Sequence, residues 1–406
     1  MEKDTASRVL KLLESGYSLP PLSVIAMKLV ELAADENSSL EDMVRLVERD
    51  PSLAVRVLNL ANNAFFCSGR RITTLSQAAL RLGSNNLKIT ALSVSLRSAF
   101  PLGKIEQLDY EQFWRVSLYR GLIAKALAGR TRCCHPEEAF VAGLTMEVGL
   151  LIFFDLFVKG RKDEIDLGIE PLEQLLQRER EFCGVDHREV GKAALKYWKF
   201  PENVIACQKY YGEAARGENV PVLCRLCEVA RLFADLLLQD SAKFHPFFTE
   251  AAHLFGLKLE AVNDIVFDTF EEVRSISESL KVEIDKEKDM MEIMEKANMA
   301  LTRISERVSK YSRGGAVLEP EKPLPTFESI DRHEKAVEDT LQAVAHEIRN
   351  PLTVVGGFAR RLATSSDPDS QIGKYARVIL DEAARLEKIL ATLPKDVVQQ
   401  IRSSGN

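Results

Sequence analysis

Residues 38–66 read SSLEDMVRLVERDPSLAVRVLNLANNAFF, and their spacing decides the class of fold. Apolar residues recur every three or four positions, which is the period of one face of an α-helix. Ser38 and Glu41 have the spacing of a capping box and predict the start of one helix. Pro51, which follows Asp50, separates this helix from a second one. The apolar face of the second helix is predicted to contain Leu53, Val57 and Leu60, widened by Val55 and Leu58.

The same helical period continues on both sides of this stretch, over residues 1–235. Short loops separate the amphipathic segments, and no alternating run of convincing length predicts a strand. The sequence therefore predicts an all-α domain at 1–235.

A charged helical stretch follows over residues 259–311, where the recurring apolar positions are Val266, Phe270, Val273, Ile276, Leu280 and Ile284. This pattern suits a coiled-coil or signalling-type helix, or a packed extension of the first domain. The segment RGGAVLEPEKPLPTF (313–327) is rich in glycine and proline, which neither helix nor sheet tolerates well. We therefore assign 236–312 to a helical extension, 313–326 to a linker, 327–395 to a final helical unit and 396–406 to a tail.

The composition excludes several classes of protein. The 406-residue chain is 46% hydrophobic and 28% charged, and its formal charge of -6 gives no general reason to bind nucleic acid. The N-terminus MEKDTASR lacks a signal-peptide pattern, and the longest apolar run is interrupted by Glu147 and Asp155. We expect a cytoplasmic protein without membrane insertion, whose seven cysteines are reduced thiols.

The final unit contains the segment LQAVAHEIRNPLTVVGG (341–357), in which a histidine stands beside a glutamate. With Leu341 at heptad position a, Ile348 and Val355 also fall at a, and position d is filled by Ile330, Val337 and Val344. His346 then falls at f, the position farthest from the apolar seam. The heptad pattern therefore predicts that His346 faces solvent.

Glu347 and Pro351 give this histidine a reactive setting. The carboxylate of Glu347 can accept a proton from the imidazole or from a group that reacts with it, which makes the other ring nitrogen a better nucleophile. Pro351 has no amide hydrogen, so the carbonyl of Glu347 loses its helical partner and the helix is expected to bend. The segment predicts an exposed, activated histidine beside a hinge.

A second amphipathic helix follows the polar loop ATSSDPDS (363–370), and the residues near its apolar face are Ile372, Tyr375, Ile379, Ala383, Leu386, Ile389 and Leu393. Two such helices form a hairpin that exposes a broad apolar stripe. A homodimer that forms a four-helix bundle would cover this stripe.

The seven residues His346 to Leu352, with the hairpin after them, resemble the H-box of the dimerisation and phosphoacceptor (HisKA) domain of sensor histidine kinases. The resemblance covers roughly residues 336–395. It implies that His346 accepts a phosphoryl group and that Glu347 is the acid-base residue for the transfer. It also implies that Asn350 positions water when the aspartyl phosphate of a response regulator receiver domain is hydrolysed.

Such kinases also need an ATP-binding domain. The segment KDVVQQIRSSGN, which follows Pro394, contains none of its motifs, and no phosphate-binding loop occurs earlier. We expect no cofactor in this chain itself. ATP and Mg²⁺ would enter through a kinase ATP-binding domain that acts in trans or through a domain that is missing from a truncated kinase.

The segments LPPLSVIAMKLVEL, TLSQAALRLGSNNLKITALS and FCGVDHREVGKAALKYWKF resemble the HDOD family, whose members are relatives of HD-type metal phosphohydrolases. Against the metal ligands of those hydrolases, this chain has Val116, Met146, Glu147, Tyr210 and Tyr211, and it keeps His187. One imidazole and one carboxylate do not hold a catalytic metal. We therefore expect no metal site and no hydrolase activity, and we favour a structural role for His187 at a helix start.

Other candidate residues have weaker patterns. Cys224 and Cys227 form a single CxxC within an apolar run, which favours small core residues over half of a zinc site or a redox pair. Cys133, Cys134 and His135 lie on a predicted loop with no further ligand, and we assign them no role. Methionines in the 290–299 segment favour packing on a helical face over an adaptable partner surface.

The sequence thus predicts a two-component signal-transduction protein. An HDOD-like input domain would act on a dimeric HisKA-like hairpin through the helix at 259–311. The alternatives are a truncated sensor histidine kinase, a non-catalytic HDOD scaffold and a residual HD-type phosphohydrolase.

Overall fold

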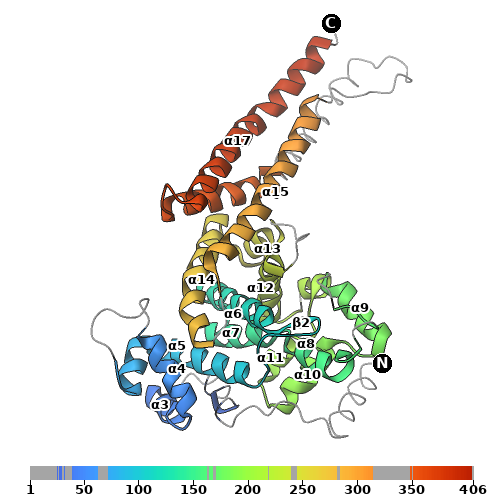
Figure 1. The fold of residues 1–406 in the computed structure, drawn as a ribbon. Helices are drawn as coiled ribbons and strands as arrows, with labels where there is room; N and C mark the ends of the chain where they lie inside the picture. The colour runs from blue at the N-terminus through green and yellow to red at the C-terminus, as the bar shows by residue number, and fades with distance from the viewer. Residues whose placement is uncertain are drawn as a thin grey trace. The chain divides into compact units, whose positions relative to one another are not determined.

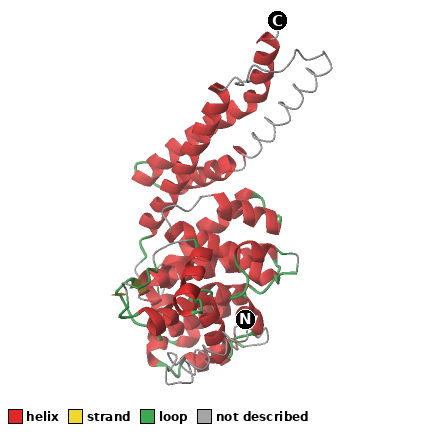
Figure 2. Cartoon of the chain, turned by 90° about the vertical axis from the view of Figure 1, so that its right-hand side faces the viewer, coloured by secondary structure: helices red, strands yellow, loops and turns green. Residues whose placement is uncertain are grey.

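The computed structural model describes residues 25, 27–29, 32, 39–62, 72–161, 164–167, 171–217, 219–238, 245–280, 284–313, 348–349 and 351–404. They form two compact units. The first draws its residues from 1–239 and 265–286, and the second from 240–264 and 287–406. Figures 1 and 2 show that both are built from helices. Within the described ranges the strands are confined to one short antiparallel pair, so the prediction of an all-α fold is confirmed.

The elements of the first unit, in chain order, are α3 (Leu40–Val47), α4 (Pro51–Ala61), α5 (Leu75–Ser98), β1 (Lys104–Ile105), β2 (Leu108–Asp109), α6 (Tyr110–Thr131), α7 (Pro136–Thr145), α8 (Val148–Phe153), the π-helix η1 (Phe154–Val158), α9 (Leu172–Cys183), α10 (His187–Tyr197), α11 (Glu202–Ala206), the 3₁₀-helix η2 (Gly212–Arg216) and α12 (Val222–Leu238). Most of α14 (Leu259–Leu280) completes this unit.

Polar caps begin several of these helices. As predicted, Pro51 opens α4, and the carboxylate of Asp50 accepts hydrogen bonds from the first free backbone N–H groups of the helix. The cap of α3 is one residue later than predicted, at Ser39 and not at Ser38. The side chain of Ser39 accepts the N–H of Asp42 at 3.1 Å, and the helix begins at Leu40. Two adjacent serines both suit a cap, and the spacing to an acidic residue alone does not choose between them.

The apolar face of α4 is narrower than predicted. Leu53, Val57 and Leu60 are buried, but Val55 is 56% exposed. Because α4 packs on α5 and α3 with one side only, a residue turned away from that side stays in solvent. The width of an apolar stripe in the sequence therefore overestimates the buried face here.

The core of the first unit lies where α6 packs against α7 and α12. A Cβ at Gly143 of α7 would lie 2.9 Å from the backbone oxygen of Arg120 in α6, so glycine permits the close approach of the two helices. Tyr119 of α6 is fully buried, and its ring centre lies 6.2 Å from that of Phe233 in α12. This packing holds the loop between α7 and α8 beside the core.

The segment Pro136–Val158 is long and apolar enough to cross a membrane. However, 72% of its most apolar stretch is buried inside the unit. The run is also divided into α7, α8 and η1, with Met146 and Glu147 between the first two. Its apolar side chains are therefore explained by packing within the fold.

The second unit contains α13 (His245–Phe255), the first residues of α14, all of α15 (Lys286–Arg313) except Lys286, a helix over 351–365 and α17 (Gln371–Ser404). The prediction of one long helix over 259–311 is wrong, because α14 ends at Leu280 and residues 284 and 285 are not helical. Asp285 directly precedes α15, where a short polar side chain is favoured because it can accept a free N–H group of the first turn. The predicted linker 313–326 lies outside the described residues except for Arg313, which ends α15.

The last two helices have the apolar faces that the heptads predict at the positions that can be compared. Ile348 and Val355 are 3% and 0% exposed, and the buried residues of α17 include Ile379, Ala383 and Leu386. Tyr375, predicted on the same face, is 49% exposed. The backbone of α17 stays helical to Ser404, beyond residue 395, where the sequence ended the hairpin.

Candidate functional site

His187 is the first residue of α10 and is 1% exposed. The helix start is capped by its neighbour Asp186, which accepts the N–H of Glu189 while the carboxylate of Glu189 accepts the N–H of Asp186. The structural role predicted for His187 is therefore supported, but Asp186 supplies the cap. His187 itself points its ring into the protein interior.

Both ring nitrogens of His187 meet a carboxylate. Nδ1 lies 2.8 Å from the oxygens of Glu179 in α9, and Nε2 lies 2.8 Å from Oε2 of Glu147, between α7 and α8. Glu179, which is fully buried, also accepts the backbone N–H of His187 at 2.8 Å. The imidazole therefore joins two acidic side chains from different helices.

Two buried arginines interact with Glu147, Arg188 through a hydrogen bond and Arg120 through its charge. Arg188 donates to Oε1 of Glu147 at 2.6 Å and to the backbone oxygen of Cys207 at 3.1 Å. Arg120 of α6 donates to the backbone oxygen of Gly143 at 2.6 Å, and both guanidinium groups are almost completely buried. We call Glu147, Glu179, His187, Arg188 and Arg120 the buried ionic cluster.

The charges in this cluster shift one another's protonation. Burial alone would lower the pKa of His187, but Glu179 and then Glu147 raise this pKa to about 10. Burial would raise the pKa of Glu147, yet Arg188 and His187 hold it well below its usual range. Burial lowers the pKa of Arg120 to about 10. At neutral pH His187 is therefore an imidazolium ion between two carboxylates.

This arrangement does not fit the metal of HD-type hydrolases. A metal ligand needs a free lone pair on an imidazole nitrogen, and both nitrogens of His187 are bonded to carboxylates on opposite edges of the ring. Met146, at the expected ligand position, is buried and offers a thioether. In the described part of the chain no three His, Cys, Asp or Glu side chains are grouped so that they could hold an ion.

Glu179 was missed by the sequence reasoning, which counted one carboxylate beside His187. Its position carried a signal, because Leu175 and Leu176 precede it by four and three residues and mark the buried face of α9. A glutamate on such a face needs a charged or hydrogen-bonding partner.

Cys224 and Cys227 are both fully buried, as predicted for core residues. Cys207, directly after the last residue of α11, is also fully buried beside them. The sulfur atoms of Cys207 and Cys224 are 3.6 Å apart. The hydrogen bond to Cys207 and burial raise the pKa of Cys224, and the pKa of Cys207 is also raised. Protonated thiols without access to solvent are poor nucleophiles and poor metal ligands.

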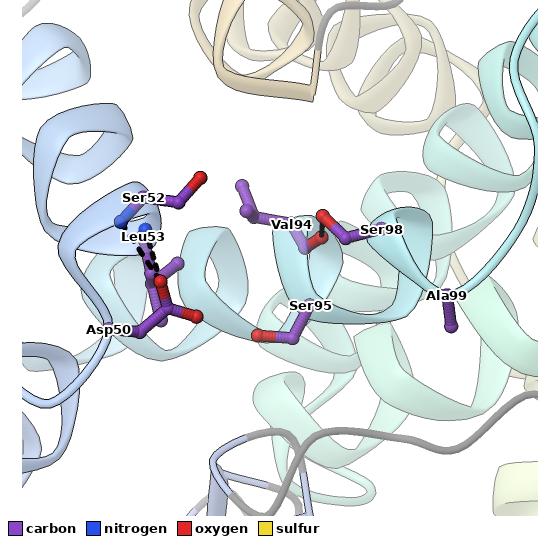
Figure 3. Close-up of a pocket in the computed structure, with 7 residues that line it drawn as sticks. All are labelled: Asp50, Ser52, Leu53, Val94, Ser95, Ser98 and Ala99. Atoms are coloured by element: carbon purple, nitrogen blue, oxygen red, sulfur yellow. Dashed lines mark hydrogen bonds between the residues drawn. The ribbon is translucent and has the colours of Figure 1, made fainter.

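A cavity of about 110 Å³ lies between the start of α4 and the end of α5 (Figure 3). Its polar lining consists of Asp50, Ser52, Ser95 and Ser98. One oxygen of Asp50 caps α4, and the hydroxyl of Ser98 donates to the backbone oxygen of Val94 at 2.7 Å. Two of these four side chains are thus bonded to the local backbone, and the set contains no acid-base pair.

The predicted phosphoacceptor residues His346, Glu347 and Asn350 lie outside the described residues. Of their neighbours, Ile348 is buried and Arg349 is exposed, and residues 348–349 and 351–365 are helical. The bend expected at Pro351 stays a prediction.

Family models match two parts of the chain. The HDOD domain matches residues 19–213, and the His Kinase A (phospho-acceptor) domain matches residues 336–393. The chain carries an HDOD domain and a HisKA domain. The buried ionic cluster thus belongs to the HDOD domain, and the segment around His346 belongs to the HisKA domain.

Solved structures share the fold at low sequence identity. An HDOD domain protein of unknown function from Geobacter sulfurreducens is 21% identical with a TM-score of 0.54, over 68% of this chain and 98% of that one. A protein from Marinobacter aquaeolei, named for signal transduction, is 21% identical with a TM-score of 0.53, over 69% of this chain and 65% of that one. At these identities the likeness concerns the fold.

A curated relative, an uncharacterised protein from Treponema pallidum, is 24% identical over 203 residues. The match includes 48% of this chain and 37% of the length of that relative. The joining of an HDOD and a HisKA domain supports a role in signal transduction.

Proposed function

We propose that this protein is a two-component signalling protein in which the HDOD domain regulates phosphorylation of His346 in the HisKA domain. The observation that carries the proposal is the HisKA match at 336–393, which contains the complete sequence His346-Glu347-Ile348-Arg349-Asn350-Pro351-Leu352. The burial of Ile348 and Leu352 beside the exposed Arg349 is consistent with an outward-facing His346.

The reaction is a phosphoryl transfer. A ring nitrogen of His346 attacks the γ-phosphorus of ATP, the bond to the β-phosphate oxygen breaks, and ADP leaves. Glu347 takes the proton that the imidazole loses, which keeps the attacking nitrogen nucleophilic. The phosphoryl group then passes to an aspartate of a response regulator receiver domain, and Asn350 positions water when the resulting aspartyl phosphate is hydrolysed.

ATP and Mg²⁺ enter this reaction with a histidine-kinase ATP-binding domain, because phosphoryl transfer requires groups that hold the nucleotide and the metal. The HisKA hairpin acts as a homodimer in which a second copy covers the apolar side chains left exposed on α17, Tyr375 and Val378. The net charge of -6 and the buried apolar run agree with a cytoplasmic protein that neither inserts into a membrane nor binds nucleic acid.

The HDOD domain is the regulatory input and does not act as a phosphohydrolase. The buried ionic cluster supports this assignment, because His187 offers no free ring nitrogen to a metal. Coupling to the HisKA domain runs through α14 and α15, the two helices between the domains in sequence. If deletion of residues 1–235 left the phosphorylation of His346 unchanged, this coupling would be absent.

The test is an assay of phosphorylation with labelled ATP. The purified chain is incubated alone and with a separate histidine-kinase ATP-binding domain, and His346→Gln is the control. We expect acid-labile label that requires the added domain and is lost in the variant. Absence of label under every condition would overturn the proposal in favour of a non-catalytic HDOD scaffold.

A further inference from the structure

Two adjacent glycines on the helix over 351–365 have different neighbours, although both belong to the second unit. A Cβ at Gly356 would lie 3.4 Å from the Cβ of Ala383 in α17, which is ordinary van der Waals contact. A Cβ at Gly357 would lie 2.5 Å from Nδ2 of Asn263 in α14, which is closer than real Cβ atoms come to a neighbouring atom. A side chain at 357 would therefore force Asn263 to move.

Asn263 has little room to move aside, because it is 4% exposed. Its Oδ1 atom is buried and has no hydrogen-bond partner within the described ranges. Its burial therefore limits how far this side chain can move.

A second contact joins the same two helices one turn further along. The guanidinium of Arg361 lies 3.2 Å from the carboxylate of Asp264. Arg361 follows Gly357 by four residues and shares its helix face, while Asp264 follows Asn263 directly. Two contacts one turn apart fix both the position of the helix along its axis and its rotation about that axis.

The helix that supplies Asn263 and Asp264 also contributes to the core of the HDOD domain. Phe270 of α14 is fully buried, and its ring centre lies 5.3 Å from that of Tyr119. Glu272 pairs with Lys125 of α6 at 2.6 Å. α14 therefore has residues in both units.

We propose that Asn263 and Asp264 are positioning residues, which set the rotation of the phosphoacceptor helix through Gly357 and Arg361. This inference rests on the proposed function. His346 precedes Gly357 by eleven residues within the HisKA match. The setting of the phosphoacceptor helix decides how the imidazole meets the phosphoryl donor, and small misplacements of a reacting group cost large factors in rate.

The experiment measures the initial rate of His346 labelling by a separate ATP-binding domain. Gly357→Ala is compared with Gly356→Ala, because both changes raise helix propensity by the same ~1 kcal/mol and differ only in what the new methyl group meets. We expect Gly357→Ala to be slowed about tenfold relative to Gly356→Ala. Adding Asn263→Ala to Gly357→Ala removes the clashing amide and is expected to recover part of the lost rate, because Asp264 and Arg361 still position the helix.

Equal rates for the two glycine variants would overturn the inference, as would failure of Asn263→Ala to rescue Gly357→Ala. If the wild-type chain is labelled and the two glycine variants are labelled at the same rate, only the positioning role fails. If the wild-type chain is never labelled, the proposed function fails and this inference fails with it.

A charge exchange keeps the test independent of any folding defect in Gly357→Ala. Asp264→Arg and Arg361→Asp are each expected to slow labelling about two- to threefold, in keeping with an exposed ion pair, and the double variant is expected to recover. Loss of rate without recovery in the double variant would count against the contact.

Discussion

The two domains use a histidine differently, because His187 of the HDOD domain is buried in the fold and His346 of the HisKA domain is the proposed phosphoacceptor. A carboxylate lies 2.8 Å from each ring nitrogen of His187, and the residue is 1% exposed. In the HisKA domain Ile348 is buried and Arg349 is exposed. Because both ring nitrogens of His187 bind carboxylates, this imidazole has no lone pair for a metal or a phosphoryl group, and the proposed reaction is assigned to His346.

The same difference extends to the ion pairs of the two units. Glu147, Arg188 and His187 meet in the interior of the first unit, where the side chains of His187 and Arg188 are 2% exposed and that of Glu147 is 12% exposed. Arg361 and Asp264 of the second unit are 49% and 38% exposed in their side chains. The exposed pair therefore contributes less energy than the buried pairs, because solvent screens it.

The largest expected effect is on chemical access to the two rings. Diethyl pyrocarbonate, which modifies unprotonated and exposed imidazoles, should modify His346 at least about 100-fold faster than His187, because His187 reacts only after local opening. Peptide mass spectrometry of the full chain at pH 7 measures both rates. Similar rates for the two residues would break the comparison.

Removal of one charge from the buried ionic cluster should destabilise the first unit strongly. Glu147→Gln leaves Arg188 and His187 with an uncompensated buried charge, and we expect a loss of about 3 kcal/mol in the free energy of unfolding. Urea denaturation followed by tryptophan fluorescence reports this unit alone, since both tryptophans, Trp114 and Trp198, belong to it.

The matched control for that variant is Glu213→Gln. Glu213 pairs with Arg216 at the surface with 86% of its side chain exposed, so we expect a change below about 0.5 kcal/mol. An equal shift of the urea midpoint in the two variants would show that burial does not set the energy of these pairs.

The stability of the first unit should depend on pH through His187. The pKa of His187 is about 10 in the folded protein, against 6.5 for a histidine without these neighbours. The charged residues that face it are Glu179, Glu147, Arg188 and Arg120. A raised pKa stabilises the fold fully below pH 6.5, and this stabilisation is lost as the pH rises toward 10. The melting temperature, detected by tryptophan fluorescence, should therefore fall as the pH rises across that range, and His187→Gln should reduce this dependence on pH. If the variant keeps the same dependence, other titrating groups cause it.

The smallest expected effect concerns the exposed pair of the second unit. Arg361→Ala should lower the free energy of unfolding by less than about 1 kcal/mol, because the ion pair is screened and the side chain is half-exposed. Circular dichroism during urea denaturation measures the change. A loss as large as that of Glu147→Gln would remove the distinction between the two units.

Much of the fold could be read from the sequence because its signals are local. The three- and four-residue spacing of Leu53, Val57 and Leu60 predicted the buried face of α4, and heptads predicted the burial of Ile348 and Val355. Errors arose where local patterns were ambiguous. Two serines competed for the cap of α3, and the continuous apolar period over 259–311 concealed the break before α15.

The sequence by itself determined the helical class, the two domains and the absence of the hydrolase ligands at Val116 and Met146, since each depends on residue type and spacing. Only the tertiary structure decided what replaced those ligands. Glu147, Glu179 and His187 are separated by 32 and 8 residues along the chain, and they meet because α7, α8, α9 and α10 fold around one point. It also brought Asn263 against Gly357, a contact between helices that no local period encodes.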